Sequence, residues 1–505
     1  MQLLRVVGFT YGNMVLLSST IGTGIFVSPK EVLKYCSMNI PIFLSMWAVG
    51  GLLSLMNALC LAELATTFPV SGVSYYFLKQ SLGYTAAFLS IWIRLFSHIL
   101  GISAQSLLIA TYLIQPFYSG CLAPELPKKC LALSFLWLFG ILNAQGIKTV
   151  IQFQAIGNLM KMAVLCLISV TGIVLLVTGD KENVTRFENG LDAELPDVSQ
   201  IVEAFLQVYY SYVGSSLLIN IAEPSTTSPK MAPPTLIHDI THQSSVKTMH
   251  HWVSTGEIKN PTNTIPKSLI SGLSIVMVFY LLTNISYVAV LTPQEIISSD
   301  SVAVTWMYRV FPFIQWATSL GISAAMMNCL SSGLLSGSRI IYAASQDGQL
   351  PFIYSMLNDH HNPVVGAILI IILSSIAIII SKLIYLMKYV GLGAWCINFL
   401  NMIGLLKMRY QKPNLPRPYK VWLPFVFGTI VLSVFIIFIP VILSPNIEHV
   451  YQVVFLFCGL LCYWLQAHFN RHAVCFDTIT CYWQLFFNVS PSEDGDNLIP
   501  SLNPD

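Results

Sequence analysis

The chain has 505 residues, of which 55% are hydrophobic and only 10% are charged, and its 25 Lys and Arg nearly balance its 23 Asp and Glu. Soluble globular proteins carry about 25% charged residues, so this composition excludes a freely soluble fold. A net charge of +2 offers no basic surface for phosphate contacts, which excludes a nucleic-acid-binding role. The predicted environment is a lipid bilayer.

Twelve apolar stretches follow one another, most of them long enough to cross about 30 Å of hydrocarbon as a helix. They lie near residues 7–28, 39–64, 84–115, 130–147, 153–178, 198–222, 268–291, 311–338, 363–381, 383–405, 421–443 and 448–468. We therefore expect an all-α polytopic membrane protein with twelve transmembrane helices. An even number of spans places both termini on the same side.

The basic residues favour cytosolic termini. When the loops are sorted on that assumption, more Lys and Arg fall inside than outside, and their densest cluster, at residues 407–420, falls in a cytosolic loop. The sequon at Asn183 then lies in an outside loop, where it is a candidate glycosylation site.

Residues 223–255 differ from the apolar sequence around them. They contain four Pro, five Ser, six Thr and four His, a composition that cannot pack a core and predicts a disordered cytosolic loop. The spacing of the four His matches no compact ligand pattern, so no metal site is expected.

Two spans contain interruptions. Residues 21–26 of the first span and 209–216 of the sixth place glycines and hydroxyl residues within the membrane, where a break is tolerated only against protein or a water-filled cavity. Paired interrupted helices are typical of transporters with inverted repeats, and their exposed helix ends suit both charges of a zwitterionic amino acid. The alternative is that the glycines only allow close helix packing.

Few charged residues fall within the predicted spans, and they include Glu63, Arg94, Lys161 and Glu203. Lys161 lies farthest from an interface, and an ionisable residue inside the membrane is a candidate functional residue. It could act as a fixed cation where a coupling ion would otherwise bind, or it could extend its ammonium to the interface. No motif of an enzyme active site is present, so we expect no enzyme activity.

Four motifs carry a resemblance to a known family. They are GTGIFVSPK at residues 22–30, AEL at 62–64 with PVSG at 69–72, SRIIYAASQDGQLP at 338–351 and RPYKV at 417–421. The sequence resembles the light chains of heteromeric amino-acid transporters, within the amino acid-polyamine-organocation superfamily. In that family it is most similar to the asc-type transporters of small neutral amino acids, and next to the aspartate/glutamate transporters.

The resemblance implies a fold and a domain organisation. It implies a first five-helix repeat at 1–195, an inverted second repeat at 196–406 with the insert at 223–255, two further helices at 407–470 and a cytosolic tail at 471–505, with helices 1 and 6 broken.

It also implies sodium-independent transport, by alternating access at the plasma membrane, of small neutral L-amino acids without a cofactor. The substrate-binding positions correspond to Gly22, Thr23, Gly24, Ile25, Tyr210, Tyr212, Gly214 and Ser215. Lys161 and Asn158 fall where a coupling cation would bind, and Cys121 falls where light chains form a disulfide with a single-pass heavy-chain glycoprotein.

The sequence departs from the family pattern at three places. Ser215 replaces a frequent Trp, Asn158 replaces a frequent Lys, and the 223–255 insert follows the sixth helix. Ala394 stands where an acidic-substrate relative has Arg, which leaves His98 as the other possible specificity residue, unless it is a hydrogen-bonded core histidine. We therefore expect small neutral substrates. An acidic amino-acid transporter and a non-transporting splice form or scaffold remain alternatives.

Overall fold

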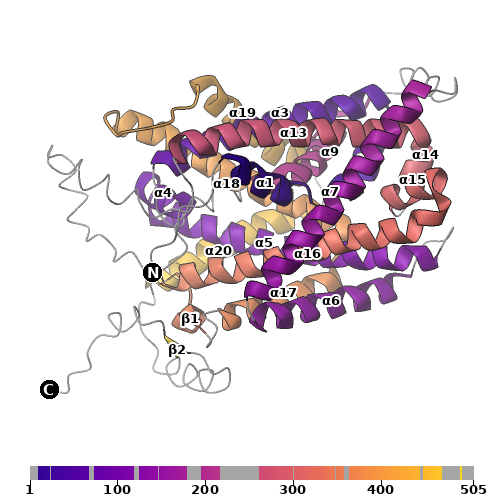
Figure 1. Ribbon diagram of the computed structural model, residues 1–505. Coiled ribbons are helices and arrows are strands. Elements are labelled where there is room, and N and C mark those ends of the chain that lie inside the picture. Colours follow the sequence, from indigo (N-terminus) through magenta and orange to yellow (C-terminus); the bar gives the residue numbers. More distant parts are fainter. Residues whose placement is uncertain are drawn as a thin grey trace, which may run out of the picture.

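The protein is an assembly of long helices, with one very short strand pair among the described residues (Figure 1). The computed structural model describes residues 9–22, 24–67, 73–118, 124–145, 147–178, 195–215, 261–299, 301–346, 349–357, 363–443, 447–468 and 490–491. The strands β1 (Met356–Leu357) and β2 (Ser490–Pro491) pair antiparallel, with Met356 opposite Pro491.

The first part of the chain supplies the helices of the expected spans one to five. In order they are α1 (Phe9–Thr20), α2 (Gly24–Tyr35), α3 (Ile40–Thr67), α4 (Val73–Ser81), α5 (Tyr84–Ile114), the 3-10 turn η1 (Gln115–Phe117), α6 (Glu125–Gln145) and α7 (Ile147–Thr178).

The second part supplies the remaining spans. In order the elements are α9 (Val198–Tyr212), η3 (Val213–Ser215), α13 (Pro261–Val290), α14 (Pro293–Ser298), α15 (Val302–Val310), η6 (Pro312–Ile314), α16 (Gln315–Gln346), η7 (Phe352–Ser355), α17 (Val364–Ile380), α18 (Leu383–Gln411), α19 (Leu423–Leu443) and α20 (Ile447–His468).

Each of the twelve expected spans overlaps a helix among the described residues, so the all-α polytopic fold is confirmed. Among the described residues, six helices are long and apolar enough to cross a membrane: α3, α5, the 157–178 part of α7, the 263–290 part of α13, the 319–342 part of α16, and α18. Large apolar side chains point outward along the bundle, including Val177 at 81% and Ile380 at 76% exposed. Such an apolar exterior suits lipid rather than water.

Several helices are longer than the apolar stretches that predicted them. α2 continues through Lys30 and Lys34 to Tyr35, α6 begins at Glu125, and α16 ends at Gln346. Hydropathy marks only the part of a helix that lies in hydrocarbon, and a helix can continue into the polar interface.

Three short helices were not expected. These are α4, α14 and α15, and they lie at the ends of the bundle. α14 has a local signal that could have predicted it, because Thr292 and Glu295 form a capping box. The Thr292 amide donates to Glu295 at 2.8 Å, and the Glu295 amide donates to the Thr292 hydroxyl at 3.3 Å.

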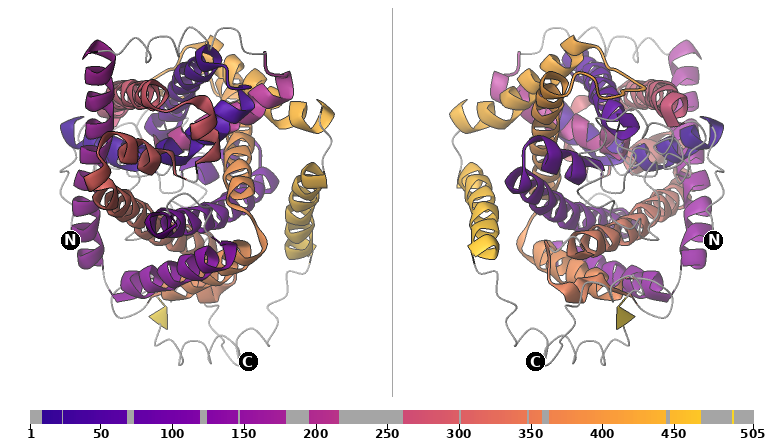
Figure 2. Two further views of the ribbon diagram at one scale, coloured as in Figure 1. Left: turned by 90° about the vertical axis from the view of Figure 1, so that its right-hand side faces the viewer. Right: turned by 90° about the vertical axis from the view of Figure 1, so that its left-hand side faces the viewer.

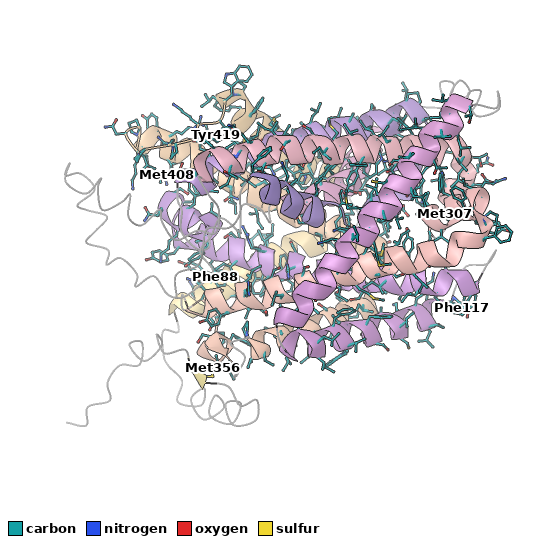
Figure 3. All side chains as sticks on the ribbon, viewed as in Figure 1. Phe88, Phe117, Met307, Met356, Met408 and Tyr419 are labelled. Atoms are coloured by element: carbon teal, nitrogen blue, oxygen red, sulfur yellow. The ribbon has the colours of Figure 1, made fainter. Side chains whose placement is uncertain are left out.

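The bundle is built around α5, which packs against α16, α18, α6 and α17. α13 packs against α3, α7 and α1, whereas α20 lies at the edge of the bundle (Figure 2). Side chains fill the spaces between the helices, with Met307 near one end of the bundle and Met408 at the other (Figure 3). Both methionines are buried.

Candidate functional site

The first predicted helix break is present. α1 ends at Thr20 and α2 begins at Gly24, with Ile21 and Gly22 in bends between them. In the sixth span, α9 ends at Tyr212 and one 3-10 turn follows. The continuation of this span lies outside the described residues, as do Thr23 and the Ser215 side chain.

The first break lies directly against the end of α9 and η3, where the second break is predicted. A Cβ atom added at Gly24 would come within 2.4 Å of the Ser211 hydroxyl oxygen, and one added at Gly214 would come within 2.1 Å of the Ser19 carbonyl oxygen. Each glycine therefore allows the other interrupted helix to approach closely. A Cβ added at Gly22 would meet only ordinary contacts at 3.8 Å. Close packing explains why glycine is needed at positions 24 and 214. The same packing brings the free ends of the helices together.

Tyr280 of α13 bridges the two breaks. Its hydroxyl lies 2.9 Å from the Thr20 carbonyl oxygen and 3.0 Å from the Ser211 carbonyl oxygen. Both carbonyls belong to the last turn of a helix, where no intrahelical donor is available. One buried phenol therefore supplies a donor at the point where α1 and α9 stop.

Aromatic rings hold Tyr280 in place. Its ring packs edge-on against Trp47, with 5.7 Å between the ring centroids. It also packs against the tilted ring of Tyr212, with 5.0 Å between the centroids. The Tyr212 hydroxyl donates to the Trp47 carbonyl at 3.3 Å. All three side chains are fully buried, so this end of the crossing is fixed by packing. Tyr212 was predicted as a site residue, but Tyr280 and Trp47 were missed because neither lies in a motif.

Polar side chains line the contact between α9 and α2. The Ser211 hydroxyl donates to the Ser28 hydroxyl at 3.2 Å, and both residues are buried. One turn earlier, Gln207 is 1% exposed, and neither atom of its amide group has a hydrogen-bond partner among the described residues. A buried polar group without a protein partner marks a place where water or a ligand can bond. Sequence reasoning missed Gln207, since a single glutamine in an apolar helix carries no pattern.

Lys161 lies deep in the bundle on α7. Its residue is 1% exposed, so its ammonium does not extend to an interface. α7 packs against α16, and Cys329 of α16 reaches the first break, since its sulfur would lie 3.8 Å from a Cβ atom at Gly22. Lys161 therefore lies on a helix that packs against one bordering the first break.

Asn158 is a residue of α7, and its side chain takes part in the contact between α7 and α16. The Asn328 amide donates to the Asn158 side-chain oxygen at 2.7 Å. One residue earlier, a Cβ atom at Gly157 would come within 2.9 Å of Asn328. The pair fixes the part of α7 that carries Lys161.

The other predicted positions have varied surroundings. Ile25 is fully buried in the main core and Tyr210 is half-buried. His98 Nε2 lies 2.7 Å from the Gly333 carbonyl oxygen, which places this side chain between α5 and α16. Ala394 of α18 packs against the main core. Cys121, Asn183 and the insert at 223–255 lie outside the described residues.

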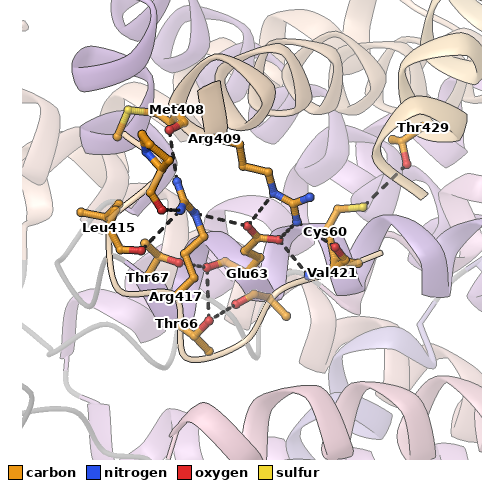
Figure 4. A network of polar contacts seen from close by, with 12 residues as sticks. Cys60, Glu63, Thr66, Thr67, Met408, Arg409, Leu415, Arg417, Val421 and Thr429 are labelled. Atoms are coloured by element: carbon orange, nitrogen blue, oxygen red, sulfur yellow. Dashed lines mark hydrogen bonds and ion pairs between the residues drawn. The ribbon is translucent and has the colours of Figure 1, made fainter. Parts of the chain in front are cut away.

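A buried ion cluster joins α3 and α18 at one end of the bundle (Figure 4). Glu63 has a side chain 1% exposed, and it faces two guanidinium groups. Arg409 Nε donates to Glu63 Oε1 at 3.0 Å and its Nη2 contacts Oε2, while Arg417 Nε lies 3.7 Å from Oε1. The Val421 amide donates to Oε2 at 2.9 Å. Two motifs of the family resemblance, at 62–64 and 417–421, thus meet in one cluster.

A second buried ion pair joins α9 to α18. Lys388 contacts Glu203, and their side chains are only 10% and 13% exposed. Glu203 was noted from the sequence only as a charged residue within the sixth span. Its partner was not found from the sequence, since Lys388 lies 185 positions away near the start of α18.

Comparison with known proteins identifies the family. The amino acid permease family model matches residues 1–237 and 245–465. The chain is 64% identical to solute carrier family 7 member 12 of Mus musculus, over 98% of this chain and 99% of that protein. It is 43% identical to solute carrier family 7 member 13 of Homo sapiens, over 97% of each. Identity to the b(0,+)-type amino acid transporter 1 of Homo sapiens is 29%, over 98% of this chain and 94% of that protein.

A polytopic helical fold, in which an interrupted first span meets the end of α9 at paired glycines, fits these matches. The chain therefore belongs to the amino acid permease family, within solute carrier family 7, and is an amino-acid transporter rather than an enzyme.

Proposed function

We propose that the protein transports small neutral L-amino acids across the plasma membrane by sodium-independent exchange, with both termini in the cytosol. The crossing of the two breaks is the observation that carries this proposal. Gly24 and Gly214 bring free helix ends within contact of one another, and such ends bind a carboxylate and an ammonium. An α-amino acid carries both groups on one carbon atom.

The surroundings of the crossing support a neutral substrate side chain. Contacts there come from Ser28, Ser211, Tyr212 and Tyr280, all uncharged. The His98 ring already bonds to a backbone carbonyl, and Ala394 has no charge to offer. Among these contacts an acidic side chain would meet no cation, which makes its desolvation costly.

Lys161 supports sodium independence. A buried ammonium in this part of the bundle can take the place of an added cation. We expect Lys161→Met to lower uptake by roughly tenfold or more. Each factor of ten corresponds to an increase of about 1.4 kcal/mol in the activation free energy of transport. Lys34→Met, which removes an exposed lysine of α2, is the matched control and should leave uptake unchanged. Equal uptake by both variants would remove Lys161 from the mechanism.

Uptake of labelled alanine, serine and aspartate into proteoliposomes tests the proposed substrate class. We expect uptake of alanine and serine, equal in sodium and in choline buffer, and little uptake of aspartate. Aspartate uptake above alanine uptake would favour the acidic transporter. If none of the three enters the vesicles, the non-transporting scaffold is favoured.

We further propose that the chain is the light chain of a heterodimer linked through Cys121. Cys121→Ser should remove a high-mass complex that reducing agent dissolves, and should leave uptake in proteoliposomes intact. Cys130 is the matched control, because it is a free and exposed thiol at the start of α6. If the complex survives Cys121→Ser and is lost with Cys130→Ser, the interchain disulfide is formed by Cys130 instead.

The insert at 223–255 follows the predicted sixth span, and Pro224 has no backbone donor to offer a helix that continued to that position. We expect deletion of residues 223–255 to raise alanine uptake at matched surface expression. A loop of this length adds little closure entropy, so the fold should form with or without it. Equal or lower uptake by the deletion variant would show that the insert is tolerated or regulatory.

A further inference from the structure

A cavity lies beyond the first break, at the end of the bundle that carries α15. We call it the outer cavity, and its volume is about 180 Å³. Its walls come from α2, α5, α6, α15 and α18, and they include Lys30 and Glu31 of α2 and Glu125 and Lys128 of α6. None of these four residues belongs to the crossing described above.

The four charged side chains come as one pair from each of two helices. α2 contributes one ammonium and one carboxylate at adjacent positions, and α6 contributes the same two charges one turn apart, with Glu125 and Lys128 separated by 4.0 Å. Their charges sum to zero. A ligand with one net charge would face the lining residues of its own sign without compensation. A dipolar ligand can instead place an opposite charge next to the ammonium groups and next to the carboxylates.

Glu31 shows where such a ligand would bond. Its Oε2 atom is buried and has no hydrogen-bond donor among the described residues, and a buried acceptor without a donor is costly. An ammonium group in the outer cavity would supply that donor. In the part of the lining that α6 supplies, the Lys128 residue is only 8% exposed and offers a positive charge to a carboxylate.

The rest of the lining suits a small apolar substituent. Phe26 and Leu107 line the cavity beside the charged groups, and the volume corresponds to several water molecules at roughly 30 Å³ each. Phe26 lies two residues after Gly24. Glu31 lies about 10 Å from Gly24 along the axis of α2, at 1.5 Å per residue. The outer cavity is thus separate from the crossing and close to it.

We propose that the outer cavity is a second binding site for a small zwitterionic amino acid, which holds the ligand before it reaches the crossing. The proposal rests on the proposed function, since it takes the same substrate class.

Equilibrium binding of labelled L-alanine to the full chain in nanodiscs tests this site by its stoichiometry. We expect two alanine molecules bound per chain in the wild type, one in Glu31→Gln and one in Gly214→Ala, in which only the crossing is blocked. Lys128→Met should likewise halve the capacity, whereas Lys129→Met should not, because Lys129 bonds to the Ile379 carbonyl outside the cavity. Ethylamine and propionate, which carry one charge each, should not displace the alanine that remains on Gly214→Ala.

One alanine per wild-type chain with none on Gly214→Ala would overturn the second site and leave the proposed function intact. Displacement of the remaining alanine by ethylamine or propionate alone would overturn the zwitterion specificity. If wild-type chains bind no alanine and transport none, the proposed function itself fails, which is a different outcome from either of these.

Discussion

Replacing Gly214 with alanine is expected to reduce alanine uptake to background. The added Cβ atom would lie 2.1 Å from the Ser19 carbonyl oxygen and 2.7 Å from the Thr20 Cα atom. Both are backbone atoms, so no side-chain rotation can relieve the overlap, and α1 must move away from α9. Because that movement separates the two breaks, the site between them is lost. Uptake of labelled alanine into proteoliposomes, at equal protein incorporation, measures the effect.

Gly101→Ala is the matched control for this substitution. A Cβ atom at Gly101 would meet only the Val390 side chain, at 3.9 Å, and alanine is the better helix former by about 1 kcal/mol. We expect this variant to transport like the wild type. If Gly214→Ala also transported normally, the close crossing of the breaks would have no role in transport.

Replacing Glu63 with glutamine is expected to cause the largest loss of stability. The Glu63 carboxylate faces Arg409 and Arg417, and all three side chains are less than 10% exposed. Removing one charge from a buried pair typically costs about 3–5 kcal/mol, since the partner charge stays buried without compensation. The glutamine variant should therefore melt at a lower temperature than the wild type in detergent, and less of it should be recovered as a monodisperse peak.

Glu295→Gln is the matched control, because it also removes one carboxylate charge from an ion pair with arginine. Glu295 pairs with Arg309, and their side chains are 37% and 57% exposed, so the pair is worth about 1 kcal/mol at most. Glutamine can also keep the capping box of α14. Equal melting temperatures for the two variants would show that the Glu63 cluster contributes no more than a surface pair.

The positions of the helix breaks could be predicted from local sequence. Gly22, Thr23 and Gly24 interrupt an apolar stretch, and Gly214 does so in the sixth span. A membrane helix must satisfy its own backbone, so such residues in the middle of a span carry a strong signal. The structure confirms the first break between Thr20 and Gly24.

The partners of the breaks could not be predicted, because they come from distant helices. Tyr280 bonds to Thr20 across 260 positions and to Ser211 across 69. A tyrosine in an apolar helix has no local feature that separates such a bridge from ordinary core packing. Trp47 and Gln207 were missed for the same reason.

The family resemblance named residues without revealing their contacts. It singled out the motifs at 62–64 and 417–421, yet only the fold shows that Glu63 and Arg417 meet. The boundaries of α2 and α6 were also displaced, because Lys30, Lys128 and their neighbours ended the apolar stretches before the helices ended. Those same charged residues line the outer cavity.

Protection of Cys329 tests most directly that the substrate binds at the crossing. This thiol is partly exposed and lies beside the first break, 3.8 Å from a Cβ atom at Gly22. In a chain that keeps Cys329 as its single cysteine and still transports alanine, we expect L-alanine to slow the reaction of this thiol with a small thiol reagent. Aspartate should not slow it. An unchanged rate at alanine concentrations that saturate uptake would contradict a substrate site at the crossing of the two breaks.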